Sequence, residues 1–169
     1  MGFKILLVFV LLMTSNTGAE ISVIRKLYTE SVDKKEKAEE LIELLTAMPK
    51  TPLVNGYLGA ANMVMAKHAL NPVKKLNYFR TGREYLDNSI RNSPDDTELR
   101  FLRHAIQVSA PSFLGYNAQK GADRRLLINR LRSGNVKDKQ LRLSVVQFLL
   151  LQENTTEEKE MLNRIYKNH

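Results

Sequence analysis

The chain has 169 residues, a formal net charge of +8, 43% hydrophobic residues and no cysteine. A chain of this length fits one domain that buries about two thirds of its unfolded surface, so we expect a single apolar core. The lack of cysteine excludes disulfides, thiol nucleophiles and thiolate metal ligands. The positive charge suits partners such as anionic lipid or an acidic protein or polymer.

The N-terminal stretch MGFKILLVFVLLMTSNTGA has the three parts of a secretory signal peptide: Lys4, an apolar run at 5–13, and small residues ending at Ala19. The run is too short to span a bilayer as a helix. We therefore predict cleavage after Ala19 and an exported, periplasmic or secreted mature chain of residues 20–169. An uncleaved anchor is the alternative. Export argues against nucleic acid as a partner.

The rest of the chain shows helical periodicity, and no stretch alternates apolar and polar residues long enough to predict a strand. A capping residue precedes proline at Thr51, Asn71 and Ser93, which marks helix starts. We predict an all-α fold of about eight helices in one domain, packed as antiparallel hairpins because the connections are short. The predicted helices span 21–31, 34–48, 52–70, 72–92, 95–108, 120–132, 138–152 and 156–167.

The predicted helix 52–70 is apolar on nearly all sides, so we expect it at the centre of the fold. His68 lies on its stripe with Tyr57, Ala61 and Val64. A lone histidine in such a stripe is more commonly a hydrogen-bonded core residue than a metal ligand or a base.

The predicted helix 72–92 has one apolar face, with Gly82 in its middle. Because glycine inside a helix costs about 1 kcal/mol relative to alanine, we expect a neighbouring backbone to come very close at Gly82. Lys75 intrudes on the same face near the helix start. Its stem is expected to lie on the core while its ammonium group reaches water.

These segments carry a resemblance. The second helix of a tetratricopeptide unit has a small residue, a large residue, a small residue and a proline at fixed spacing. The same pattern is found at Gly82, Leu86, Ser89 and Pro94. Leu58-Gly59 is similar to the Leu-Gly pair of the first helix, so the chain resembles a degenerate tetratricopeptide protein over one unit, about a quarter of its length. The stretches KLNYFRTGREYLDNSI and ELRFLRHAIQVSAPSFLGY also resemble small exported bacterial helical proteins of unassigned function. The resemblance implies a right-handed stack of helical hairpins and a scaffold or binding role, and it assigns no functional residue.

Acidic residues crowd the start of the predicted helix 95–108. We expect Ser93 or Asp95 to cap this helix. Asp96 and Glu98 then lie at the positive end of its dipole, a position that accounts for them without catalysis.

Glu98 also falls inside the apolar arc of this helix. The sequence leaves open whether Glu98 is buried. If it is, the carboxylate needs a cation, and Lys75 or Arg83 of the preceding helix is the expected partner. We interpret this as a structural ion pair.

A narrow polar wedge on the helix 95–108 consists of Arg100, Arg103, His104 and Gln107. The wedge either faces solvent or lines a groove, and solvent is favoured because long charged side chains are seldom buried unpaired. Together with Lys75 and Tyr116 it forms our candidate binding surface for an acidic protein or peptide. In the loop 111–118, we expect the side chains of Phe113, Leu114 and Tyr116 to pack over the end of the core.

The segment 120–142 is strongly basic, with eight cations against Asp123 and Asp138. We interpret it as a solvated helix pair, with an anionic membrane surface as the alternative partner. No aromatic residue interleaves with its cations, as a single-strand nucleic-acid binder would need.

Catalytic and cofactor signatures are missing from the sequence, including glycine-rich phosphate loops and zinc-protease, serine-hydrolase and calcium-loop motifs. His68, His104 and His169 have no carboxylate at metal-ligand spacing on their own helices. We therefore expect a non-enzymatic exported scaffold or protein/peptide-binding module with no metal and no cofactor. The alternatives are a small enzyme acting on an envelope polymer through Glu98 or His68, and a membrane-surface protein using the segment 120–142.

Overall fold

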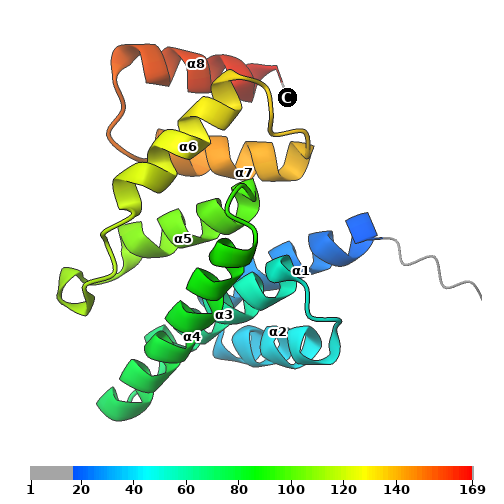
Figure 1. The fold of residues 1–169 in the computed structure, drawn as a ribbon, viewed down its shortest axis with the longest axis vertical. Helices are drawn as coiled ribbons and strands as arrows, with labels where there is room; N and C mark the ends of the chain where they lie inside the picture. Colours follow the sequence, from blue (N-terminus) through cyan, green and yellow to red (C-terminus); the bar gives the residue numbers. More distant parts are fainter. Residues whose placement is uncertain (1–16, 169) are drawn as a thin grey trace, which may run out of the picture.

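The protein is built from α-helices, as the periodicity predicts. The structure, a computed structural model, describes residues 17–168, and this part contains eight α-helices, one short 3-10 helix and no strand. Figure 1 shows the chain turning back on itself after each helix. The helices are α1 (Thr17–Ser31), α2 (Lys35–Ala47), α3 (Pro52–His68), α4 (Pro72–Asn92), α5 (Thr97–Ser109), α6 (Lys120–Arg132), α7 (Lys139–Leu150) and α8 (Thr156–Lys167), with the 3-10 turn η1 (Ser112–Leu114) after α5.

The predicted signal peptide lies largely outside the described residues, which begin at position 17. α1 starts at Thr17, so the predicted cleavage point after Ala19 falls in its first turn. No helix within 17–168 has both the length and the hydropathy to cross a bilayer.

Two of the three proline-marked helix starts are capped as predicted. The Thr51 side chain accepts a hydrogen bond from the Val54 N–H, and the Asn71 side chain accepts from the first turn of α4. The third start is different, because Asp96, and neither Ser93 nor Asp95, caps α5 by accepting from the N–H groups of the next turn. α5 therefore begins at Thr97, slightly later than predicted.

α3 lies at the centre of the part of the molecule formed by α1 to α5, where it packs against the other four helices. Most of its residues are buried, which confirms the prediction from its apolar circumference. Its contact with α4 is especially close: a Cβ atom on Gly82 would lie 2.5 Å from the carbonyl oxygen of Gly59. The backbone approach predicted at Gly82 is confirmed.

The apolar side chains divide into separate clusters instead of the single core expected from chain length. One large cluster is formed by α1 to α5, a small one lies between α2 and α3, and another is formed by α6 to α8. The division arises at α5, which packs Leu99 and Leu102 into the first cluster and Phe101 against the last. In Figure 1, α5 accordingly lies between α1–α4 and the group α6–α8.

Candidate binding site between α4 and α5

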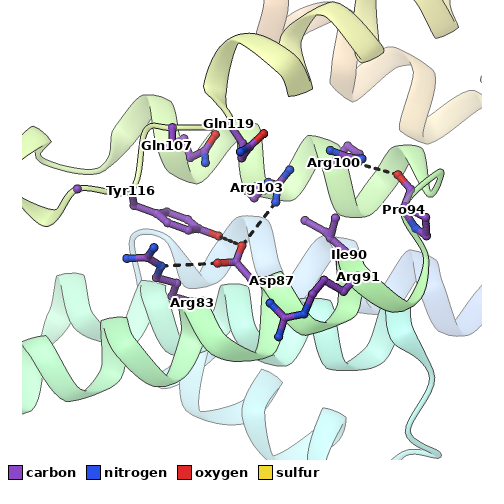
Figure 2. A pocket seen from close by; sticks show the side chains of 12 residues that line it. Arg83, Asp87, Ile90, Arg91, Pro94, Arg100, Arg103, Gln107, Tyr116 and Gln119 are labelled. Carbon is purple, nitrogen blue, oxygen red and sulfur yellow. Dashed lines mark hydrogen bonds and ion pairs between the residues drawn. The ribbon is translucent and has the colours of Figure 1, made fainter.

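A hollow of about 460 Å³ lies between α4, α5 and the loop that follows η1 (Figure 2). We call it the α4–α5 pocket. Four of the six residues predicted as a binding surface line it, namely Arg100, Arg103, Gln107 and Tyr116. α4 contributes Arg83, Asp87 and Arg91, three residues outside the predicted surface.

The other two predicted residues, Lys75 and His104, do not line the pocket. Lys75 is exposed in the first turn of α4. His104 is fully buried on the side of α5 that faces α7, where its Nε2 lies 3.1 Å from Gln152 Oε1 and its ring meets Phe148 edge-on. Its predicted place in a solvent-facing wedge is wrong because α7 packs on that side of α5.

Asp87 is the central acceptor of the pocket. Its Oδ1 accepts a hydrogen bond of 2.8 Å from the Tyr116 hydroxyl and lies 3.6 Å from Arg103 Nη1. Arg83 approaches the other carboxylate oxygen at 3.6 Å and lies over the Tyr116 ring. Asp87 is half-buried because the loop after η1 folds back beside it.

Tyr116 anchors that loop, as expected from its aromatic character. Its ring packs edge-on against Phe79, and the residue is 5% exposed. Burial, together with the charge of Asp87, raises the pKa of the Tyr116 hydroxyl, which therefore remains a hydrogen-bond donor. The same expectation is wrong for Phe113, which is 85% exposed.

Asp123 of α6 holds the arginines of α5 in place, and it is fully buried. Its carboxylate accepts from Arg103 Nε at 2.6 Å and Nη2 at 2.8 Å, and from Arg100 Nη1 at 2.9 Å. Burial alone would lower the pKa of Arg103, but the bonds to Asp123 outweigh it and the pKa is raised. The solvent-facing position predicted for Arg103 is thus wrong, since the pairing allows its burial.

Asp123 belongs to the segment 120–142, for which the sequence predicts a solvated helix pair, and its burial contradicts that prediction. A usable signal was present, because Asp123 shares one helix face with Leu127 and Leu131, four and eight residues further on. A carboxylate in such an apolar row requires a cationic partner from another element.

Gln107 carries an unpaired polar atom at the wall of the pocket. The residue is 5% exposed, and its Oε1 has no hydrogen-bond partner within residues 17–168. A buried polar atom in this state costs roughly 1–3 kcal/mol unless a partner is supplied. Gln107 therefore leaves an unsatisfied acceptor beside the pocket.

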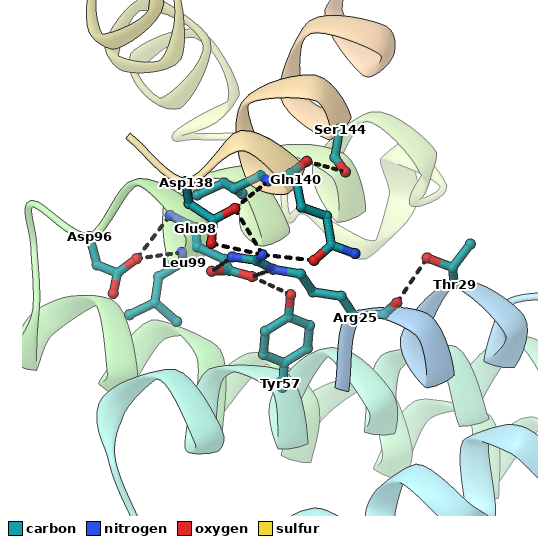
Figure 3. A network of polar contacts seen from close by, with 10 residues as sticks. Arg25, Thr29, Tyr57, Asp96, Glu98, Leu99, Asp138, Gln140 and Ser144 are labelled. Carbon is teal, nitrogen blue, oxygen red and sulfur yellow. Dashed lines mark hydrogen bonds and ion pairs between the residues drawn. The ribbon is translucent and has the colours of Figure 1, made fainter. Parts of the chain in front are cut away.

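A second polar network surrounds Glu98 (Figure 3). Glu98 is 5% exposed, so the apolar arc in which the helical periodicity places it is buried. Its two oxygens accept hydrogen bonds of 2.7 Å from Arg25 Nε and Nη2, and Oε1 also accepts from the Tyr57 hydroxyl at 2.5 Å. Arg25 further donates to Asp138, the N-cap of α7, and to Gln140. The network therefore ties α1, α3, α5 and α7 together.

The predicted partners of Glu98, Lys75 and Arg83, are both wrong. Lys75 is exposed at the far end of α4, and Arg83 is turned toward the pocket. The actual partner, Arg25, lies on α1 between Ile21 and Tyr28 at helical spacing, so its position on the inner face could have been seen in the sequence.

The structure does not bring Glu98 and His68 together. His68 lies at the end of α3, with its Nε2 2.8 Å from the Ser31 carbonyl oxygen. Tyr57, which contacts Glu98, lies about 16 Å away along the same helix axis. Within residues 17–168, no three His, Asp or Glu side chains are placed to hold a metal ion.

The basic segment 120–142 is partly neutralised by acids from other parts of the chain. Arg124 pairs with Glu158 at 2.8 Å, Arg130 with Asp95 at 3.3 Å, and Arg132 with Glu157 at 3.1 Å. The bond from Arg124 lowers the pKa of Glu158 to about 2. These pairs reduce the excess charge that this segment offers to an anionic surface.

The burial of His104 predicts a pH dependence of stability. Burial lowers its pKa below the ordinary value of about 6.5, although Gln152 and the charge of Asp123 act in the opposite direction. The unfolded chain then binds the proton first, so stability is complete above about pH 6.5 and falls as the pH decreases, by up to about 1.4 kcal/mol per unit. Urea denaturation between pH 7.5 and about pH 5.5 should show this slope in the wild type and a flatter one in His104→Gln. Equal slopes would contradict it.

Comparison of the chain with protein-family models, with curated proteins and with solved structures finds no match. The interpretation of the α4–α5 pocket therefore rests on its own residues and geometry.

Proposed function

We propose that this chain is an exported, non-enzymatic helical scaffold that binds a protein or peptide, and that its α4–α5 pocket receives an acidic segment of that partner. The observation that carries the proposal is the charge of the pocket. Four arginines line it, and the two carboxylates that pair with them are Asp87 in the wall and Asp123 buried behind α5. The pocket therefore keeps a positive excess that a partner's carboxylate can balance.

The arginines divide into two groups with different tasks. Arg100 and Arg103 are held by Asp123 and shape the wall. Arg83 and Arg91 are exposed at the rim, where Arg83 contacts Asp87 and the Tyr116 ring and Arg91 bonds the neighbouring Asn88, and a partner's carboxylate can compete for both. Guanidinium groups bind carboxylates through paired hydrogen bonds, and Gln107 adds a polar group at the wall.

The packing of the hairpins supports a scaffold role. The close contact of Gly59 with Gly82 fixes α4 against α3, so the rim arginines lie on a rigid helix. The tetratricopeptide resemblance points in the same direction, because helical-hairpin proteins commonly present binding grooves on rigid helices.

The test is capture of partners from an envelope extract by the wild type and by the variant Arg83→Gln/Arg91→Gln. Losing two charge-assisted contacts should raise the dissociation constant of a specific partner by about tenfold or more. Titration with the purified partner measures this change. The matched control is Arg80→Gln/Arg125→Gln, which removes the same charge from exposed positions outside the pocket. A partner bound equally by all three proteins would contradict the proposal.

The variant Gln107→Leu tests whether Gln107 contributes to partner binding without contributing to stability. The substitution removes the buried, unpaired Oε1, so stability should be unchanged or raised by up to about 1 kcal/mol. Partner binding should nevertheless weaken. A variant that loses stability and keeps full binding would assign Gln107 to the fold alone.

A further inference from the structure

The turn between α3 and α4 exposes apolar side chains at one end of the molecule. Leu70 is 98% exposed, Val73 67% and Leu76 38%. We call residues 69–76 the hairpin tip. In Figure 1 it lies at the lower end of the α3–α4 hairpin, at the opposite end of the molecule from α8. Isolated exposed apolar residues are common in soluble proteins, but three within seven residues at a protruding end form a patch.

The hairpin tip is held in a fixed conformation. The Ala69 N–H donates to the Met65 carbonyl oxygen, Asn71 caps α4, and Pro72 begins it. Behind the tip, α3 and α4 are locked together at Gly59 and Gly82. The apolar side chains are thus presented outward by a rigid backbone, without a conformational change that would cover them.

Cations surround the tip, and acidic residues are missing from this part of the chain. Lys74 and Lys75 are exposed in the first turn of α4, and Lys67 is 59% exposed at the end of α3. The sequence from Leu44 to Arg83 contains no aspartate or glutamate. The α1–α2 turn beside the tip contributes Asp33, which pairs with Lys67 and leaves Lys74 and Lys75 with their charge available.

We propose that the hairpin tip docks on an anionic lipid surface. Leu70 and Val73 enter the headgroup region, and Lys74 and Lys75 contact the lipid phosphates. Apolar insertion and lysine attraction reinforce one another at such a surface, with each lysine worth roughly fivefold in affinity. This surface is separate from the α4–α5 pocket and from the basic segment 120–142, so a partner in the pocket and a membrane at the tip can be bound together.

The chain contains no tryptophan, so a single substitution at the tip provides a unique reporter. Leu70→Trp should show a blue-shifted emission and quenching by brominated acyl chains on vesicles of phosphatidylglycerol and phosphatidylcholine, because tryptophan settles at the membrane interface. The matched control is Leu151→Trp, at an equally open position between α7 and α8, where residue 151 is 87% exposed. It should show no shift, nor should Leu70→Trp on phosphatidylcholine alone.

The contribution of charge is tested by adding Lys74→Glu/Lys75→Glu to the Leu70→Trp reporter. Vesicle binding should weaken by at least about tenfold. The matched pair Lys137→Glu/Lys139→Glu changes the net charge equally at exposed positions elsewhere and should weaken binding by less than about threefold.

Three results would overturn the proposal: no shift of Leu70→Trp on anionic vesicles, which would leave the tip to a protein partner; equal shifts at positions 70 and 151; or equal losses for the two lysine pairs. The position-specific readout also separates docking through the tip from attachment through the apolar run at 5–13.

Discussion

Replacing Gly82 with alanine is expected to lower the free energy of unfolding by about 2–3 kcal/mol, and the melting temperature by roughly 5–10 °C. The new methyl group would lie 2.5 Å from the Gly59 carbonyl oxygen and 2.9 Å from the Met63 nitrogen. Both are backbone atoms, so α3 and α4 must move apart along the contact that organises the larger cluster. Urea denaturation followed by circular dichroism measures the change.

Gly121→Ala is the matched control for this prediction. A Cβ atom there meets only the flexible end of Arg125, at 3.4 Å. The gain in helix propensity then dominates, and the variant should be as stable as the wild type or up to about 1 kcal/mol more stable. If both alanine variants shift in the same direction and by similar amounts, the close approach of α3 to α4 does not govern stability.

Replacing Asp123 with alanine is expected to cost about 3–5 kcal/mol. The fully buried carboxylate accepts three hydrogen bonds from Arg100 and Arg103, and its removal leaves a buried guanidinium without its main partner. The cost is expected to appear as a lower midpoint in urea denaturation and as loosened packing of α6 against α5, visible in amide hydrogen exchange.

The exposed pair between Arg130 and Asp95 provides the control, since Asp95 is 89% exposed in it. Asp95→Ala should change stability by less than about 1 kcal/mol. The double variant Arg103→Met/Asp123→Leu should lose less stability than Asp123→Ala, because apolar side chains replace both members of the buried pair. A double variant that is less stable than the single one would contradict this account.

The helices could be predicted closely from the sequence because their signals are local. Capping residues followed by proline mark the starts of α3 and α4, and apolar periodicity gives the inner face of each helix. The start of α5 was misplaced because several acidic residues compete for its cap, and only the backbone conformation selects Asp96.

The candidate site could be predicted only in part, because a helical wheel gives the direction of a side chain and does not identify its neighbour. The periodicity placed Glu98 in an apolar arc without deciding whether it is buried, and its partner Arg25 lies on another helix distant in sequence. The helical wheel likewise predicts an exposed His104, but α7 packs on that side of α5 and buries it. Pairing across helices depends on the tertiary fold, which periodicity does not specify.

The position of α5 between two apolar clusters determines how the chain can be divided. A break in the loop 111–118 would separate Phe101 from its aromatic contact with Phe148. It would also separate Asp123 from both arginines with which it forms ion pairs. Neither piece is expected to reach its native structure alone. The two halves are expected to regain native order only by complementation, with α5 as the shared template on which the C-terminal helices assemble.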